Sequence, residues 1–419
     1  MNSSMIDHAD RVWRGDVRDD ITGPAGLYGG VTEVTDGVGL SPGFGNTIVF
    51  RAGGELILFD TGYPGGAELL HQAVRGWDTA PVSTAIFSHG HIDHVCGMAP
   101  FDAEPGRRPT VIAQEKTGER FDRYLLTRGY NEIINRRQFR VGSLAWPSSF
   151  RRPDITYRDA LTVTRGGLTF ELFHVQGETG DATVAWVPEL SVLCPGDMFI
   201  WVSPNCGNPQ KVQRYPREWV TALRRMAALG AEIMLPSHGA PVFGADRITQ
   251  ALTDTALWLE SLVEQTLDGL NAGKRLDELV RTVRPPRDLA SRVYLQARYD
   301  EPEFVVRSIW RRYAGWYDGN PAHLKPAPEA QLATAIADLA GGPEALAEAA
   351  MRYLDAGDQR LAGHLAEMAL LAAPEDGRAR EVHAAVYRAR AGSEGSLMAQ
   401  GIFHAAADGP DGTGPDQQG

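Results

Sequence analysis

Residues 83 to 98 read STAIFSHGHIDHVCGM, and this stretch decides the fold that we expect for the chain. It begins with apolar residues that are typical of the end of a buried strand. His89, His91, Asp93 and His94 follow within six positions. Imidazole suits zinc and related divalent ions, and a carboxylate adds negative charge to such a site. Four ligand-type side chains directly after a strand therefore predict a metal site.

The spacing of these ligands favours two ions rather than one. His89 and His91 lie two positions apart on an extended segment, so their rings can converge on one ion. Asp93 and His94 follow where the chain turns into a helix, and so point to a second ion beside the first. Gly90 lets the backbone make this turn without a Cβ clash. For a single histidine a packed core or surface position is the simpler interpretation, but the set of four favours ligation.

The His-x-His-x-Asp-His pattern resembles the signature of the metallo-β-lactamase superfamily. The resemblance implies an α+β fold class, with an αββα sandwich and a one- or two-metal hydrolase site at one edge of it. Asp60, in the segment FDTG, ends a strand near the expected site. In the superfamily the corresponding aspartate supports the metal-binding loop by hydrogen bonds. An ordinary aspartate in a turn is the alternative interpretation.

The bulk composition limits the classes of protein that the chain can represent. It has 419 residues, of which 43% are hydrophobic and 22% charged, and this suits a globular protein of two or three domains. The formal net charge of -12 argues against a general nucleic-acid binder, which would carry a basic face. Three cysteines and the lack of an apolar leader predict a reducing, cytoplasmic location. We expect no membrane span, because no window of about 18 apolar residues is present.

Two carboxylates and a histidine further along the chain complete the expected site. Glu178 stands in a GETGD turn, Asp197 ends an apolar strand in CPGDMF, and His238 follows another strand in PSHGAP. Most of the superfamily has a histidine in place of Glu178, in a GHTPG-like turn. The alkylsulfatase branch instead has a glutamate at this position, and a second carboxylate follows it in the sequence after a fixed number of residues. Asp197 follows Glu178 after the same number of residues. That branch usually has glutamate at the second position, so Asp197 departs from it.

The resemblance implies a centre of two divalent ions. Zinc is the expected metal, and the carboxylate ligands also suit manganese or iron. Asp197 would bridge the ions and Asp93 would accept a proton from the attacking water, which makes these two the expected catalytic residues. Two ions lower the pKa of a shared water towards neutrality. The expected ligands are His89, His91 and Glu178 for the first ion, and Asp93, His94 and His238 for the second.

Basic residues near these motifs are candidates for contacts to a substrate anion. Lys211 and Arg214 follow Asp197 in a loop, about where the alkylsulfatase branch places an arginine near its sulfate site. Arg136 and Arg137 belong to an arginine-rich helical stretch. For all four residues a solvated surface charge is the alternative interpretation.

The C-terminal third of the chain has a helical pattern. The segment GWYDGNPAHLKP, residues 315 to 326, resembles the start of the alkylsulfatase dimerisation domain and implies a homodimer. Small residues at helix-packing spacing predict paired antiparallel helices like tetratricopeptide repeats. A helical cap without a partner is the alternative. We expect an irregular N-terminal arm (1–26), a catalytic domain (27–247), a helical connection (248–312), a dimerisation domain (313–403) and a disordered tail (404–419).

Three functions follow from these observations. The first is hydrolysis of a small ester by a metal-activated water, with an alkyl sulfate as the substrate that the resemblance implies. The second is hydrolysis of another carboxylic ester, a lactone or a thioester on the same metal centre. The third is a non-catalytic, dimeric binding protein with a vestigial site, and the complete set of ligands argues against it. Release of sulfate rather than carboxylate from a small panel of esters separates the first two.

Overall fold

A computed structural model describes residues 2–21 and 30–409 of the chain. In these residues no helix is long and apolar enough to cross a membrane. The chain divides into two compact units. The first comprises Met1–Arg128, Trp146–Lys274 and Leu279–Tyr313, and the second comprises Gly129–Ala145, Arg275–Glu278 and Ala314–Gly419.

The first sheet of the first unit carries the histidine-rich segment. It has seven strands in the order β1-β2-β3-β4-β5-β6-β7, antiparallel up to β4 and parallel from β4 to β7. Parallel neighbours need long crossover connections, and helices provide them here. The strands are β1 (Thr32–Thr35), β2 (Val38–Ser41), β3 (Thr47–Ala52), β4 (Glu55–Phe59), β5 (Val82–Ile86), β6 (Thr110–Gln114) and β7 (Ile155–Tyr157). The helices of these connections within the first unit are α2 (Ala67–Trp77), α3 (Ile92–Val95), α4 (Ala99–Asp102) and α5 (Lys116–Leu126).

The second sheet contributes the two carboxylate segments. Its six strands lie in the order β13-β12-β11-β10-β9-β8, and only β11 and β12 run parallel. Hairpins join most of its strands, because antiparallel neighbours allow short turns. The strands are β8 (Ala160–Arg165), β9 (Leu168–Val175), β10 (Ala182–Val187), β11 (Val192–Cys194), β12 (Ile233–Met234) and β13 (Val242–Phe243).

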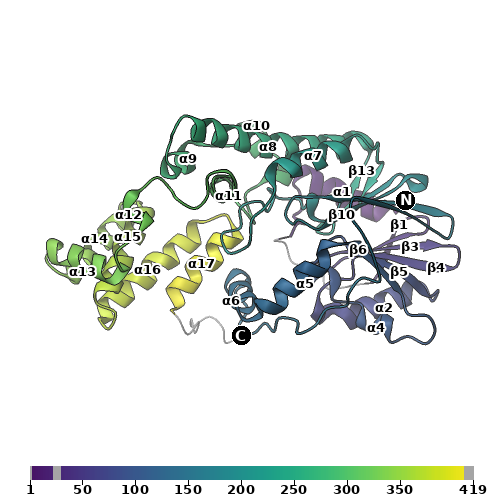
Figure 1. Cartoon of the computed structure of the whole chain (residues 1–419), viewed down its shortest axis with the longest axis horizontal. Coiled ribbons are helices and arrows are strands. Elements are labelled where there is room, and N and C mark those ends of the chain that lie inside the picture. The colour runs from purple at the N-terminus through teal and green to yellow at the C-terminus, as the bar shows by residue number, and fades with distance from the viewer. Residues whose placement is uncertain (1, 22–29, 410–419) are drawn as a thin grey trace. The chain divides into compact units, whose positions relative to one another are not determined.

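The two sheets face each other across a shared apolar core. Phe50 and Phe59 of the first sheet pack with Phe170 and Leu172 of the second, and the ring centroids of Phe50 and Phe170 lie 5.1 Å apart. Each fully buried side chain of this size contributes roughly 1.5–3 kcal/mol. Helix α2 lies on the outer face of the first sheet (Figure 1), and its Leu70 belongs to the apolar cluster between them. This core positions the strand ends that carry the candidate site.

Helices also cover the outer face of the second sheet, so the first unit has the predicted αββα layers. Helix α7 (Pro216–Ala227) packs on β9, and α8 (Ala245–Asn271) packs on β12 and β13. Trp219 of α7 and Trp258 of α8 are fully buried. Other helices of the first unit are α10 (Arg287–Ala290), α11 (Pro302–Ala314) and most of α9 (Leu276–Thr282).

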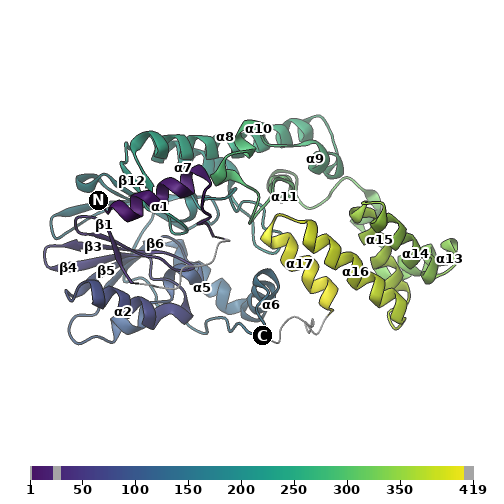
Figure 2. The ribbon, with the colours of Figure 1, turned by 180° about the vertical axis from the view of Figure 1, so that it is seen from behind.

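The N-terminal segment is helical, so the prediction of an irregular arm is wrong for Ser3–Arg14. These residues form α1 (Figure 2). The side chain of Asn2 accepts a hydrogen bond from Ser4 N–H at 3.1 Å, which caps the helix at its start. Gly15, at φ 80°, ends it. Part of the predicted arm, residues 22–26, lies outside the described residues.

The second unit is helical, as predicted. Its C-terminal helices pack through small side chains such as Ala350, Ala366 and Ala369, which let their backbones approach closely. The predicted disordered tail is wrong for residues 404–408, because α17 continues to Asp408, and residues 410–419 lie outside the described residues. The helices are most of α6 (Arg128–Phe139), then α12 (Pro321–Leu324), α13 (Glu329–Ala340), α14 (Pro343–Asp355), α15 (Gln359–Ala372), α16 (Gly377–Ser393) and α17 (Leu397–Asp408).

Candidate metal centre

The seven predicted ligands all belong to the first unit, where they follow strand ends. His89 and His91 come directly after β5, and Asp93 and His94 occupy the short helix α3. Glu178 lies in the turn between β9 and β10, Asp197 in the 3₁₀ turn Gly196–Met198 after β11, and His238 in the loop after β12. The structure brings these side chains together within one cluster.

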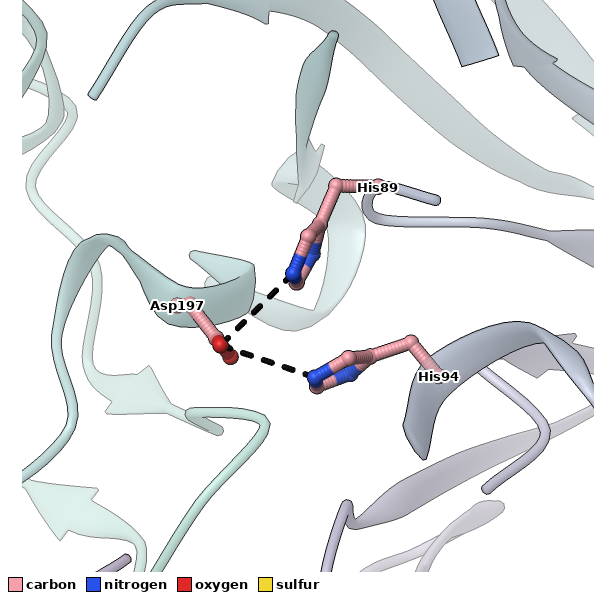
Figure 3. Close-up of side chains that lie close together, drawn as sticks. All are labelled: His89, His94 and Asp197. Atoms are coloured by element: carbon pink, nitrogen blue, oxygen red, sulfur yellow. Dashed lines mark ion pairs between the residues drawn. The ribbon is translucent and has the colours of Figure 1, made fainter. Parts of the chain in front are cut away.

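Asp197 lies at the centre of the cluster. Its Oδ2 atom is 3.7 Å from His89 Nε2, 3.5 Å from His94 Nε2 and 3.4 Å from His238 Nε2. Figure 3 shows the side chains of His89 and His94 pointing towards this carboxylate from two different segments. A carboxylate that faces several imidazoles in this way suits the predicted position between two ions.

Three groups within the described residues could each hold an ion. Asp93, His94 and His238 form one, and it coincides with the ligand set predicted for the second ion. The other two groups both include Asp197, one with His89 and His94 and one with His91 and Glu178. Asp93 Oδ2 lies 3.4 Å from His94 Nε2 and 3.6 Å from His238 Nε2.

Asn205 and Arg214 hold the side chain of Glu178. Its Oε1 atom accepts hydrogen bonds from Asn205 Nδ2 and from an Arg214 guanidinium nitrogen, the latter at 3.2 Å. Another nitrogen of Arg214 donates to the backbone carbonyl of Glu178. His91 Nδ1 lies 3.8 Å from the same Oε1 atom. The sequence motif predicted Glu178, but it did not show that Arg214 and Asn205 hold it.

Several buried atoms of the cluster have no hydrogen-bond partner in the described part of the chain. They are His94 Nε2, Glu178 Oε2, Asp197 Oδ1 and both ring nitrogens of His238. A buried polar atom without a partner costs about 1–3 kcal/mol, so a group of them is rare unless a ligand satisfies them. Imidazole nitrogens and carboxylate oxygens are donors that divalent metal ions prefer. The residues therefore fit a metal centre, while their ligation of metal stays a prediction.

Burial and mutual charge set the protonation of the cluster. Burial lowers the pKa of His89 to about 4, so that its ring is neutral at pH 7. Burial would also lower the pKa of His94, but the carboxylates of Asp197 and Asp93 outweigh it and raise this pKa well above its usual range. Burial would raise the pKa of Asp197, yet His238 and the other histidines hold it well below its usual range. A divalent cation can take over the positive charge that these protons supply.

Asp60 connects three of the ligand segments. Its Oδ2 atom accepts hydrogen bonds from His94 Nδ1 at 2.9 Å, Ser88 Oγ at 2.7 Å and Ser237 Oγ at 2.8 Å. The other oxygen accepts from Ser88 N–H at 2.7 Å. His89 Nδ1 lies 2.9 Å from Ser88 Oγ, and donation to that oxygen leaves Nε2 of the ring facing the cluster. These contacts suit the supporting role that the sequence predicted for Asp60.

Asp181 is a residue that the sequence interpretation missed. Its Oδ2 atom accepts a hydrogen bond from Gly90 N–H at 2.9 Å, and its Oδ1 atom accepts from Arg120 Nε at 2.8 Å. Gly90 lies between two predicted ligands, so this carboxylate ties their loop to the turn that carries Glu178. His174 donates to Gly180 O at 3.0 Å and steadies the same turn, in keeping with its position in β9.

The basic residues predicted to contact substrate separate into two groups. Arg136 and Arg137 belong to the second unit, where they line a cavity with residues of α15, α16 and α17. Lys211 and Arg214 lie in the first unit, and burial lowers the pKa of Lys211 to about 7. Arg123 of α5 belongs to the arginine-rich stretch 123–140, in which the sequence suggested that one arginine holds the substrate anion. Burial lowers its pKa, and the charges of Arg120 and Arg214 lower it further.

The sequence held weak signals for the missed residues Asp181 and Arg120. Arg120 and Arg123 lie three positions apart and so share one face of α5, and Asp181 belongs to the same GETGD turn as Glu178. These positions in the sequence do not show whether a charged side chain forms a buried ion pair or is exposed to solvent. That distinction needs the contact between Asp181 and Arg120, which are 61 positions apart.

Two family descriptions match successive parts of the chain. Residues 40–238 match the Metallo-beta-lactamase superfamily, and residues 275–410 match Alkyl sulfatase dimerisation. Among solved structures, the stereoselective inverting sec-alkylsulfatase Pisa1 from Pseudomonas sp. superposes with a TM-score of 0.81 at 22% identity, covering 90% of this chain and 65% of that one. This likeness confirms the predicted fold class.

Curated relatives share part of their length with the chain. A linear primary-alkylsulfatase of Pseudomonas sp. is 30% identical over 333 residues, which cover 74% of this chain and 63% of that protein. An (R)-specific secondary-alkylsulfatase of Pseudomonas sp. is 23% identical and covers 73% and 50%, respectively. An alkyl/aryl-sulfatase of Saccharomyces cerevisiae is 24% identical and covers 84% and 59%. The chain thus spans between half and two thirds of the length of these relatives, and it combines a metallo-beta-lactamase superfamily domain with an alkyl sulfatase dimerisation domain.

Proposed function

We propose that the chain is a metal-dependent hydrolase that cleaves alkyl sulfate esters at a centre of two divalent ions. The observation that carries the proposal is the cluster around Asp197, in which buried nitrogen and oxygen atoms face one another without hydrogen-bond partners among the described residues. The names of the curated relatives support the substrate class, since all three are alkylsulfatases or alkyl/aryl-sulfatases. The proposed ligands are His89, His91, Asp93, His94, Glu178, Asp197 and His238.

Each group of the cluster has a role in this proposal. Bound divalent ions, which we propose to be zinc, would lower the pKa of a water molecule and so supply the nucleophile at neutral pH. Asp93 would accept the proton of that water, and its partly exposed carboxylate near His94 supports this role. Asp197 would bridge the ions. His94 keeps its Nε2 atom towards the cluster because Asp60 accepts the hydrogen bond of Nδ1.

We propose that Arg123 and Lys211 hold the sulfate group. Burial lowers the pKa of each side chain, and the positive charge of Arg214 lowers it further. Both side chains are half-buried, and an anion stabilises a half-buried cation that lies near other cations, so a sulfate ester placed here would gain charge-assisted hydrogen bonds. Arg214 donates hydrogen bonds to Glu178, and these contacts support a role for it in the placement of that carboxylate.

The proposed assembly is a homodimer formed through the C-terminal helices. The match of residues 275–410 to Alkyl sulfatase dimerisation supports it. Large apolar side chains on this unit, among them Trp316 at 69% and Leu339 at 86% exposure, are suited to burial against a second copy.

The first experiment measures metal content together with sulfate release from a medium-chain alkyl sulfate. Wild type is compared with Glu178→Ala and with the control Glu189→Ala, an exposed glutamate of the β10–β11 turn. We expect two metal ions per wild-type chain and release of sulfate, with both quantities reduced only in Glu178→Ala. Metal binding without sulfate release, together with release of a carboxylate from a carboxylic ester, lactone or thioester assayed in parallel, would favour that second class of substrate. Lack of bound metal after reconstitution would contradict the catalytic assignment and leave a binding protein.

A further inference from the structure

Asp300 is a fully buried acidic residue that lies outside the proposed ligand set, two positions before the start of α11. Its Oδ2 atom accepts a hydrogen bond from Gly207 N–H, and its Oδ1 atom accepts one from Glu301 N–H at 2.7 Å. Its backbone carbonyl oxygen accepts a further hydrogen bond from Ser203 Oγ at 2.8 Å. Two of these three donors belong to one loop, residues 203–207, so Asp300 fixes that loop to the segment before α11.

The same loop contacts a proposed metal ligand through Asn205. This side chain is buried, and its Nδ2 atom donates a hydrogen bond to Glu178 Oε1. Asn205 lies between Ser203 and Gly207, the two loop residues that donate to Asp300. The loop is therefore held on both sides of Asn205, and the position of Asp300 determines where the amide of Asn205 meets Glu178.

The backbone of α11 comes very close to the same loop at Gly207. A Cβ atom on Gly207 would stand 2.2 Å from the carbonyl carbon of Phe304 and 2.2 Å from the backbone nitrogen of Val305. Glycine permits this approach because it has no Cβ atom. The loop thus has no room to move towards α11, and the hydrogen bond from Gly207 N–H to Asp300 keeps it from moving away.

We propose that Asp300 is a positioning residue for Glu178, and that it acts through the loop of residues 203–207 and Asn205. The inference rests on the proposed function, in which Glu178 is a metal ligand. Hydrogen-bond partners of metal ligands contribute about 10- to 100-fold to metal affinity. Asp300 acts one contact further from the ligand than Asn205 does, so the effect of its loss should lie near the lower end of this range.

The test compares wild type with Asp300→Ala, Asp300→Asn and the control Asp288→Ala, at an exposed position of α10. Asp300→Ala removes both side-chain acceptors, whereas Asp300→Asn keeps one oxygen that can accept from Gly207 N–H. Competition with a chromophoric chelator measures Zn²⁺ affinity, and the visible absorption of the Co²⁺-loaded protein reports on the arrangement of the ligands. Unfolding of the metal-free protein by urea measures stability separately.

We expect Asp300→Ala to bind Zn²⁺ about tenfold more weakly than wild type, and its Co²⁺ spectrum to change towards that of Glu178→Ala. Asp300→Asn should retain most of the affinity, and Asp288→Ala should match wild type. A loss of stability with unchanged Zn²⁺ affinity and an unchanged Co²⁺ spectrum would overturn the proposal, because Asp300 would then support the fold alone. Failure of wild type to bind Zn²⁺ or Co²⁺ would instead overturn the proposed function.

A double variant tests whether Asp300 acts through Asn205. Asn205→Leu removes the amide that joins the loop to Glu178, so adding Asp300→Ala to it should weaken Zn²⁺ binding no further. Additive losses in the double variant would overturn the proposal. If Asp300→Ala does not fold, Ser203→Ala replaces it, since this change removes only the hydrogen bond to the Asp300 carbonyl. Ser203→Ala should also weaken Zn²⁺ binding, and wild-type affinity in that variant would then overturn the proposal.

Discussion

Asp60 accepts a hydrogen bond from His94 Nδ1 at 2.9 Å, and both side chains are fully buried. The contact leaves His94 Nε2 facing Asp197 and Asp93. The same Asp60 oxygen accepts from Ser237, which is 177 positions away and next to His238. One carboxylate thus orients ligand segments from both sheets.

Asp60→Asn should weaken metal binding about 10- to 100-fold, the usual effect of losing a partner of a metal ligand. The amide has one oxygen in place of two, so it cannot accept all the hydrogen bonds that Asp60 accepts from Ser88, Ser237 and His94. Competition with a chromophoric chelator measures the affinity. Asp78→Asn is the matched control, because Asp78 accepts from Ala80 N–H at 2.7 Å outside the cluster. Wild-type affinity in a folded Asp60→Asn protein would contradict the supporting role.

Asp181→Asn should destabilise the first unit by about 3–5 kcal/mol, because it leaves the buried charge of Arg120 without its partner. The pKa of Asp181 lies well below its usual range: burial would raise it, but Arg120 outweighs this effect. Chemical unfolding measures the loss. Metal affinity should fall as well, since Gly90 depends on the same carboxylate.

The double variant Asp181→Asn with Arg120→Met separates two effects of losing Asp181. One is the unpaired buried charge of Arg120, and the other is the lost hydrogen bond from Gly90 N–H. Stability should recover in part, because no unpaired charge remains, while metal affinity should stay low. Full recovery of metal affinity would show that Asp181 does not position the loop of Gly90.

Arg123→Gln and Arg214→Gln should have different effects. Arg123→Gln should raise KM for an alkyl sulfate at least about tenfold with unchanged metal content, because a charged hydrogen bond to the substrate is worth roughly 1.5–3 kcal/mol. Arg214→Gln should lower the metal content, because Glu178 loses the guanidinium that holds it. Metal analysis and steady-state kinetics on the same preparations measure both. The assignment is wrong if the two variants behave alike.

Asp300 should make the stability of the first unit depend on pH. It is fully buried, and burial raises its pKa from 3.8 to about 7. Between these values the folded chain keeps a proton that the unfolded chain has lost, so the free energy of unfolding should fall as pH rises. The slope is at most about 1.4 kcal/mol per pH unit.

Asp300→Asn should remove this contribution to the dependence of unfolding free energy on pH. The control Asp288→Asn, at an exposed position, should leave it unchanged. Unfolding by urea at pH 5 and pH 8, in the presence of a chelator so that metal binding does not contribute, measures the difference. An equal slope in wild type and Asp300→Asn would exclude Asp300 as its source.

Much of the fold and of the candidate site could be predicted because their signals are local. The strand before His89 and the spacing of His89, His91, Asp93 and His94 are contained in one short stretch. Alternating apolar residues predicted the two sheets, and small residues at helical spacing predicted the C-terminal helices. Each of these patterns reports which face of an element is buried, and that information needs only neighbouring residues.

The remaining features depend on contacts between distant residues. Arg214 and Glu178 are 36 positions apart, and only the tertiary structure shows that Arg214 contacts a predicted ligand. Gly90 and Asp181 are 91 positions apart, so no local pattern pairs them. The helix α1 was missed because its polar sequence resembles an irregular arm, although buried Ala9 and Val12 give it an apolar side.

The sequence by itself determined the superfamily fold and the residue types that converge at the strand ends, because spacing along a strand or helix fixes which side chains share a face. Only the tertiary structure decided the partners of those side chains: which carboxylate holds which loop, and which arginine contacts a predicted ligand. Hydrogen bonds and cavities arise where separate segments meet, and the free energy of such contacts depends on a geometry that no single segment contains.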